Sequence, residues 1–123
     1  MLNILQYVYA LGLGGVLYLI IKSLETVMPH YFLKLNPCRP TFAQDMTDEE
    51  KAVMQQHVVY IKSFMDKGIV KVFGPVLHPE GVFGIGVFDV ETETQLKEII
   101  AGDPASSINQ YEYYPMRAVL PDI

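Results

Sequence analysis

The chain has one cysteine, Cys38, and this scarcity excludes several architectures. A single cysteine cannot form an internal disulfide, so the fold is not a disulfide-stapled secreted scaffold. No second thiol stands near it in the sequence, which argues against a CxxC redox pair. A reducing compartment is consistent with this composition.

Metal and cofactor patterns are also missing. His30, His57 and His78 do not stand at the spacings of zinc ligands, either with one another or with Cys38. The pattern Gly84-Ile85-Gly86 lies inside a predicted strand and lacks the strand-to-helix turn of a dinucleotide site, so it indicates close backbone packing. The sequence therefore predicts neither a metal nor an organic cofactor.

Charged side chains are absent from residues 1–21, and basic ones are outnumbered afterwards. Residues 28–123 carry eight Lys or Arg and thirteen Asp or Glu, a net charge of −5. A surface of this sign repels phosphate backbones, so nucleic acid is not an expected partner.

The leader, residues 1–27, calls for a separate interpretation from the rest. Residues 4–21 approach the length of a membrane-spanning helix, although three glycines and three tyrosines weaken the pattern. A basic stretch before the apolar run and a small-residue cleavage site after it are both absent, which argues against a signal peptide. Three interpretations stay open: a membrane anchor that leaves the domain in the cytoplasm, an upstream extension before Met28, and a helix packed on a partner.

The residues after the leader predict a strand and then a helix. Residues 31–35 alternate and are rich in aromatic side chains, as in a short strand, and residues 36–46 are expected to form a loop. Thr47 and Glu50 have the spacing of a capping box, so a helix should begin there. It should end at Gly68, and its apolar side chains recur every three or four residues at Met54, Val58, Ile61, Phe64 and Met65.

A hairpin is expected next. Residues 69–73 and 82–90 are rich in β-branched side chains, and Gly74-Pro75 is expected to break the first of these strands.

A shorter helix and a last strand complete the pattern. Thr92 and Gln95 suggest a second capping box before a helix that buries Leu96, Ile99 and Ile100. Residues 111–114 and 116–120 predict the last strand, interrupted at Pro115. The resulting order, βαββαβ, predicts an α+β ferredoxin-like antiparallel sheet with two helices on one face, over residues 28–123. The other sheet face would need cover, so we expect a homodimer.

Two polar residues in this pattern have roles that the sequence leaves open. His57 stands on the sheet-facing stripe of the first helix, where it is either a hydrogen-bonded core histidine or a proton carrier at a pocket wall. Asp103, just before Pro104, either caps the following turn or orients an imidazole.

Several short segments together carry a resemblance to a known family. They are His57-Val-Val-Tyr60-Ile, Asp66-Lys-Gly68, Phe73-Gly74-Pro75, Gly84-Ile-Gly86-Val-Phe88, Gly102-Asp103-Pro104 and the run 111–117. In this order and spacing they resemble the YciI-like (YCII-related) family over nearly all of residues 28–120. The resemblance implies a ferredoxin-like subunit that dimerises through its sheet, as in the dimeric α+β barrels.

The resemblance also implies a site. The proposed family site pairs a helix histidine with the aspartate of the Asp-Pro turn, and these positions match His57 and Asp103. Gly74-Pro75 matches a segment that lets backbone approach a ligand. From the residues alone, Tyr111 is either a sheet-packing side chain or, where it faces a pocket, a substrate-binding one that hydrogen-bonds a substrate hydroxyl. The leading hypothesis is a cofactor-independent lyase or isomerase acting on a small molecule. The alternative is a non-catalytic binding or assembly module, tethered to a membrane where the leader is an anchor.

Overall fold

The computed structural model describes residues 30–122. The predicted leader, residues 1–27, with its proposed membrane segment 4–21, lies outside the described residues. Within the described part, no helix combines the length and the apolar character needed to cross a bilayer.

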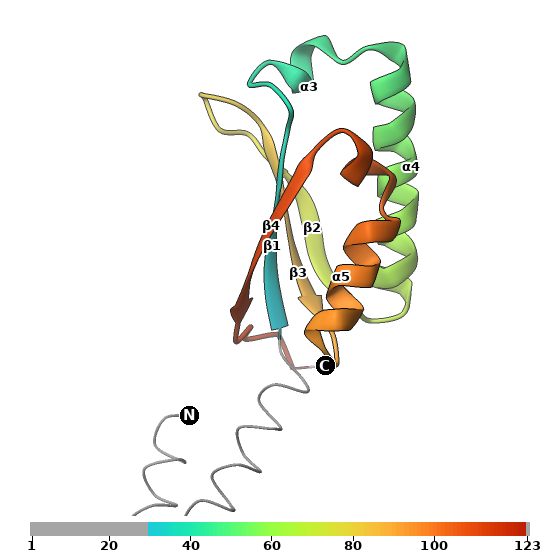
Figure 1. The fold of residues 1–123 in the computed structure, drawn as a ribbon. Helices are drawn as coiled ribbons and strands as arrows, with labels where there is room; N and C mark the ends of the chain where they lie inside the picture. Colours follow the sequence, from blue (N-terminus) through green and yellow to red (C-terminus); the bar gives the residue numbers. More distant parts are fainter. Residues whose placement is uncertain (1–29, 123) are drawn as a thin grey trace, which may run out of the picture.

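The described chain forms one four-stranded antiparallel sheet with helices on one of its faces (Figure 1). The sheet order is β2-β3-β1-β4, so the first and third strands are central. The elements follow the predicted βαββαβ succession, with a short helix added before α4 and a 3₁₀ turn added after α5. Their bounds are β1 His30–Asn36, α3 Phe42–Asp45, α4 Asp48–Asp66, β2 Val70–Val76, β3 Phe83–Asp89, α5 Glu93–Gly102, η1 Pro104–Ser107 and β4 Gln110–Met116.

Both helix starts form as the sequence predicts, with one difference. At α4, the Thr47 hydroxyl accepts from the Glu50 amide and the Glu50 carboxylate accepts from the Thr47 amide, which completes the capping box. At α5, Thr92 likewise accepts from the Gln95 amide, but the Gln95 side chain accepts from the amide of Glu91 instead of Thr92. α4 ends before Gly68, whose φ of +77° is the left-handed conformation that favours glycine.

The strand ends differ from the sequence prediction at two prolines. β2 does not break at Gly74-Pro75 but continues to Val76, with Pro75 opposite Gly84. β4 likewise runs through Pro115 and ends at Met116, so residues 117–120 are not strand. Both are edge strands, where a residue without an N–H donor is tolerated because it has a neighbour on one side only.

The predicted loop 36–46 also contains structure. Its second half forms α3, which buries Phe42 beside the amino-terminal end of α4. Arg39 fixes this segment because its guanidinium donates to the carboxylates of both Asp45 and Glu50, at 2.7 and 2.8 Å.

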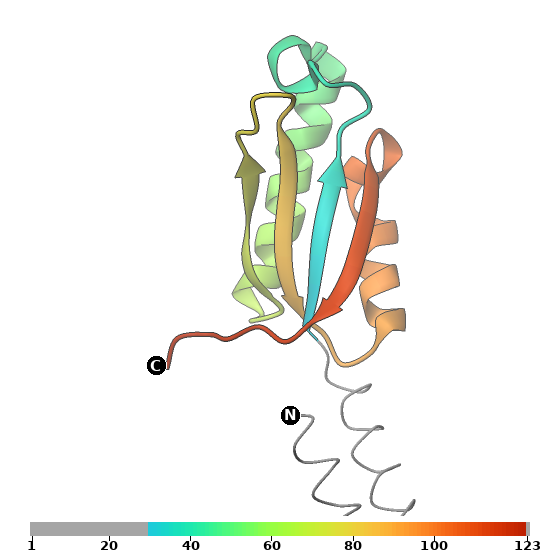
Figure 2. The ribbon, with the colours of Figure 1, turned by 90° about the vertical axis from the view of Figure 1, so that its left-hand side faces the viewer.

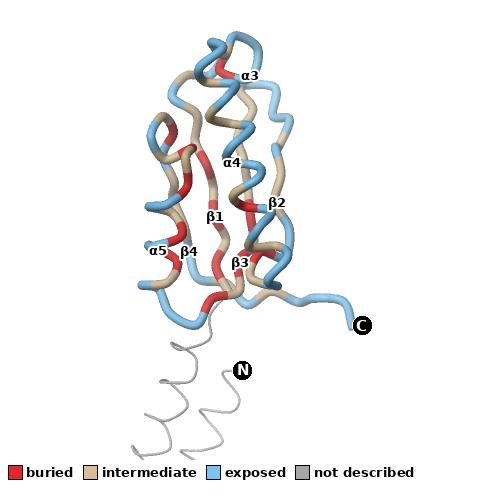
Figure 3. Tube along the Cα trace, turned by 90° about the vertical axis from the view of Figure 1, so that its right-hand side faces the viewer, coloured by how far each residue is buried: buried red, intermediate tan, exposed pale blue. Residues whose placement is uncertain are grey.

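The hydrophobic core lies between the sheet and its helices, as the burial pattern in Figure 3 shows. Alternate residues of β1 point into it, and Leu33, one of the most deeply buried side chains, lies at its centre. Of the predicted helix stripe, Ile61 is buried, whereas Val58 is 47% exposed. The other core members are Tyr31, Val70, Phe88, Val90, Leu96 and Ile99.

Candidate functional site

The two polar residues singled out from the sequence meet in space. His57 lies near the middle of α4, and Asp103 lies between α5 and η1, yet the His57 Nδ1 is 2.8 Å from the Asp103 Oδ2. α4 packs directly against η1, which brings the two chain segments together. The imidazole is 12% exposed and the carboxylate is completely buried.

Asp103 does more than contact the imidazole. Its Oδ1 accepts from the Ala105 amide at 2.9 Å, which caps η1, and its Oδ2 accepts from the Tyr111 hydroxyl at 2.5 Å. The capping role and the pairing role, which are alternatives at the level of sequence, are therefore both present. Three donors fix a buried carboxylate, so its position is determined by α4, η1 and β4 together.

A close approach between α4 and α5 explains the glycine that precedes this aspartate. The Tyr60 hydroxyl, one turn after His57, donates to the Ile99 carbonyl at 2.7 Å. The same hydroxyl would lie 2.5 Å from a Cβ atom at position 102. A side chain there would displace the Tyr60 hydroxyl, so Gly102 leaves room for the hydrogen bond that joins α4 to α5 just before Asp103.

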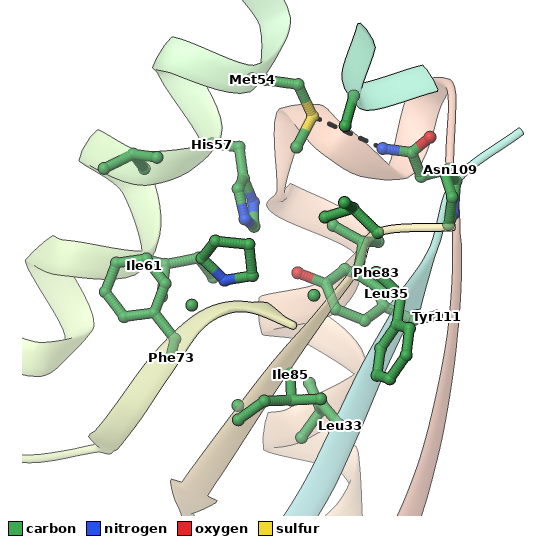
Figure 4. Close-up of a pocket in the computed structure, with 18 of the residues that line it drawn as sticks. Leu33, Leu35, Met54, His57, Ile61, Phe73, Phe83, Ile85, Asn109 and Tyr111 are labelled. Carbon is green, nitrogen blue, oxygen red and sulfur yellow. Dashed lines mark hydrogen bonds between the residues drawn. The ribbon is translucent and has the colours of Figure 1, made fainter. Parts of the chain in front are cut away.

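The hydrogen bond to Asp103 also orients the imidazole. An ionised carboxylate can only accept, so Nδ1 carries the proton and donates it to Asp103. No described residue bonds to Nε2. The ring projects from α4 toward the cavity in Figure 4, so the lone pair of Nε2 is available to a molecule placed there.

The cavity has a volume of about 270 Å³ and lies between α4, α3 and the helix-facing side of the sheet. Two glycines of β3 form part of its floor, Gly84 and Gly86, which occupy alternate positions and so face the same side. Predicted substrate-binding residues Gly74, Pro75 and Tyr111 also line it. The remaining wall is mostly apolar, from Leu33, Leu35, Pro37, Phe42, Ala43, Met46, Met54, Val58, Ile61, Phe73, Val82, Phe83, Ile85 and Phe88.

Polar side chains are few in this wall. It contains His57, Asn109 and Tyr111, and no Lys, Arg, Asp or Glu among the described residues. Burial, and then the hydrogen bond to Asp103, raises the pKa of Tyr111 far above its usual value. Tyr111 therefore stays protonated and donates to Asp103, so it offers a ligand its ring instead of its hydroxyl.

A family model described as YCII-related domain matches residues 31–119, which include both members of the pair. The chain belongs to the YCII-related domain family. A comparison with curated proteins found no match. In this YCII-related domain, the described residues include no group of three or more His, Cys, Asp or Glu side chains placed to hold a metal ion.

Two parts of the site in this YCII-related domain were missed by the sequence analysis. The first is Asn109, a buried amide in the cavity wall that follows η1 and has no motif around it. The second is the α3 segment, whose Phe42 and Met46 close one side of the cavity. The ion pair with Arg39, which lowers the pKa of Glu50 to about 2, ties this segment to α4. Arg39 stands six residues before Asp45 and eleven before Glu50, but these charges did not indicate a cavity.

Proposed function

We propose that this YCII-related domain is a small enzyme in which His57 moves a proton on an uncharged small molecule, as a lyase or isomerase without metal or organic cofactor. One observation carries the proposal. Nδ1 of the imidazole is held by a buried carboxylate while Nε2 faces an apolar cavity. A core histidine that served packing alone would not need an empty volume beside its second nitrogen.

The geometry supports the following sequence of steps. Nε2 takes a proton from an acidic C–H or O–H bond of the bound molecule, and the electron pair of that bond stays on the substrate. Asp103 stabilises the resulting imidazolium, because its contact with Nδ1 then joins two opposite charges. Return of the proton to another atom gives isomerisation, whereas departure of a leaving group gives elimination. Such acid-base assistance is typically worth about 10² to 10⁴ in rate.

Replacement of His57 tests the proposal. We expect His57→Gln to slow the exchange of solvent deuterium into the α C–H bonds of a bound uncharged ketone by about 10² to 10⁴. Glutamine retains a polar side chain of similar reach but has no basic nitrogen. Exchange can be followed by NMR or mass spectrometry on a panel of cyclic and aryl ketones.

The matched control for this variant is His78→Gln, since His78 is exposed on the loop between β2 and β3. Exchange that is equally fast in the wild type and in His57→Gln would contradict the enzyme proposal. Ketones that bind in the cavity without exchanging in the wild type would instead favour the alternative, a non-catalytic ligand-binding module.

We also propose that two copies of the chain pair through their sheets. Figure 2 shows the sheet face opposite the helices, over which no described helix lies. Alternation along the strands places Phe32, Phe83, Ile85 and Val87 on this face, around the Lys34–Glu112 ion pair; Phe83 and Ile85 also belong to the cavity lining. Toward its edges, Val72 and Tyr114 are 49% and 55% exposed. A second copy of the same face would cover all of them.

A charge at the centre of this face should separate the copies. We expect Val87→Lys to convert a dimer into a monomer at micromolar concentration, because an unpaired ammonium would be buried against apolar side chains. Light scattering after size-exclusion chromatography measures the change. Val59→Lys, on the exposed side of α4, is the matched control and should leave the dimer intact. A wild-type monomer under the same conditions would contradict the dimer.

A further inference from the structure

We propose that Asn109 is a second polar anchor of the cavity, and that it binds an oxygen of an uncharged, largely apolar ligand whose acidic proton faces His57. This inference rests on the proposed function of His57 and deepens it by naming the class of ligand. Neither the sequence motifs nor the family match assigns a role to this asparagine.

The amide of Asn109 is buried and poorly satisfied. The residue is 6% exposed, and its Oδ1 has no hydrogen-bond partner among the described residues. Its Nδ2 has a single partner in the described chain, the thioether sulfur of Met54, at 3.5 Å. A thioether is a weak acceptor, and buried amides are nearly always fully bonded. An oxygen of a ligand would therefore form a stronger hydrogen bond with the Asn109 amide than the Met54 sulfur does.

A backbone hydrogen bond fixes the position of Asn109 in the wall. Its backbone N–H donates to the Ala105 carbonyl at 2.9 Å, which closes the turn that Asp103 caps at its other end. The same turn thus places the carboxylate behind the imidazole and the amide beside the cavity. Figure 4 shows the side-chain amide nitrogen of Asn109 directed toward the Met54 sulfur across one end of the cavity.

The spacing of the two anchors suits one small molecule. Met54 precedes His57 by three residues on the same face of α4, so their Cα atoms are about 4.5 Å apart along the helix axis, and Asn109 contacts the first of these side chains. A ligand oxygen at Asn109 and an acidic hydrogen at Nε2 would then be a few bonds apart. When the proton leaves the carbon next to a ligand carbonyl, the C–H electrons form the enolate and its negative charge develops on the carbonyl oxygen. The side-chain N–H of Asn109 donates to that oxygen.

The electrostatics of the wall favour a ligand that starts without charge. The buried carboxylate of Asp103 lies directly behind the imidazole, and no Lys or Arg of the described chain lines the cavity. A carboxylate or phosphate on the ligand would lose its hydration without gaining a cation. The leucine, isoleucine and phenylalanine side chains in the wall match an apolar ring or chain as the body of the ligand.

Matched probes separate the role of Asn109 from that of His57. The meta and para isomers of hydroxyacetophenone offer a hydroxyl and a carbonyl on a ring, and the corresponding ethylphenols lack only the carbonyl. We expect the wild type to bind one hydroxyacetophenone about five- to tenfold more tightly than its ethylphenol, as one hydrogen bond to a buried amide provides. In Asn109→Leu, which is close in shape, the two affinities should agree within about twofold. The matching hydroxybenzoate should bind the wild type at least about tenfold more weakly than the ketone.

A measurement on the wild type keeps the test independent of how the variant folds. The side-chain NH₂ resonance of Asn109 should shift on addition of the hydroxyacetophenone and stay in place with the ethylphenol. The NH₂ of Asn36, which donates to Glu112 at 3.0 Å outside the cavity, is the internal control. An unmoved Asn109 resonance, a carbonyl preference that survives in Asn109→Leu, or failure of both probes to bind at millimolar concentration would overturn the inference.

The two proposals fail separately. A carbonyl preference that depends on Asn109, together with deuterium exchange that does not depend on His57, would contradict the enzyme proposal and support this anchor. A preference that is insensitive to Asn109, together with exchange that requires His57, would do the reverse.

Discussion

Asp103→Asn is expected to reduce proton transfer by about 10³- to 10⁴-fold while the domain still folds. The asparagine offers one acceptor atom where the carboxylate serves the His57 ring, the Tyr111 hydroxyl and the Ala105 amide. When its NH₂ group faces the imidazole, Nδ1 must accept, and the ring proton moves to Nε2. The nitrogen that faces the cavity then has no lone pair with which to take a proton.

The tautomer of His57 can be measured without a substrate. Nitrogen resonances of the imidazole ring distinguish a proton on Nδ1 from one on Nε2, and we expect the first in the wild type and the second in Asp103→Asn. Loss of the charge-assisted contacts should also lower the free energy of unfolding by about 2 kcal/mol. Asp66→Asn, at the exposed end of α4, is the matched control. A wild-type tautomer with full exchange activity in Asp103→Asn would contradict the orienting role.

Gly84→Val is expected to weaken ligand binding by about 5- to 150-fold and to leave the domain as stable as before, or more so. A Cβ atom at position 84 lies in ordinary contact, 3.4 Å from the Cβ of Leu35, so the backbone accepts it. The two methyl groups of valine would then project into the cavity floor and overlap a bound molecule, at a cost of about 1 to 3 kcal/mol. Replacing glycine inside a strand should raise the free energy of unfolding by about 0.5 to 1 kcal/mol.

Gly84→Ala provides the intermediate step of this series. Affinity for the hydroxyacetophenone should decrease in the order Gly, Ala, Val, while the melting temperature stays constant or rises by a few degrees. Calorimetric titration and thermal unfolding on the same samples measure both quantities. Undiminished binding in Gly84→Val would show that the ligand does not occupy the floor of this cavity.

The sequence predicted the elements well because their signals are local. The Thr47 capping box and the left-handed Gly68 mark the two ends of α4 through contacts within a few residues. The continuity of β2 through Pro75 and of β4 through Pro115 could not be predicted in the same way. Whether a strand tolerates proline depends on its place at the edge of the sheet, and the order of strands is set by contacts between distant residues.

The site was predictable only in part. Placing His57 on the inner face of α4 followed from helical periodicity, whereas its partner stands 46 positions later and was suggested by family resemblance. Asn109 carried no signal, because a polar residue after a short turn looks like any loop residue until the turn is folded. The cavity itself depends on side chains that are missing at Gly84 and Gly86, where the sequence indicated close backbone packing. An added Cβ at Gly86 would lie 2.8 Å from the Phe88 ring, so this glycine makes room for a core side chain, whereas a Cβ at Gly84 would make only ordinary contacts with Leu35.

β3 gives consecutive residues opposite surroundings, and this makes the protein sensitive to the length of the hairpin loop. Gly84 and Gly86 face the cavity under α4, while Ile85 and Val87 take the alternate positions of the β3 pleat. Sliding β3 by one position against β1 would turn both branched side chains inward and both glycines outward. A one-residue insertion or deletion in the segment 77–82 could cause such a slip. The slip would fill the cavity with branched side chains and, at the same time, remove those side chains from the opposite face of the sheet.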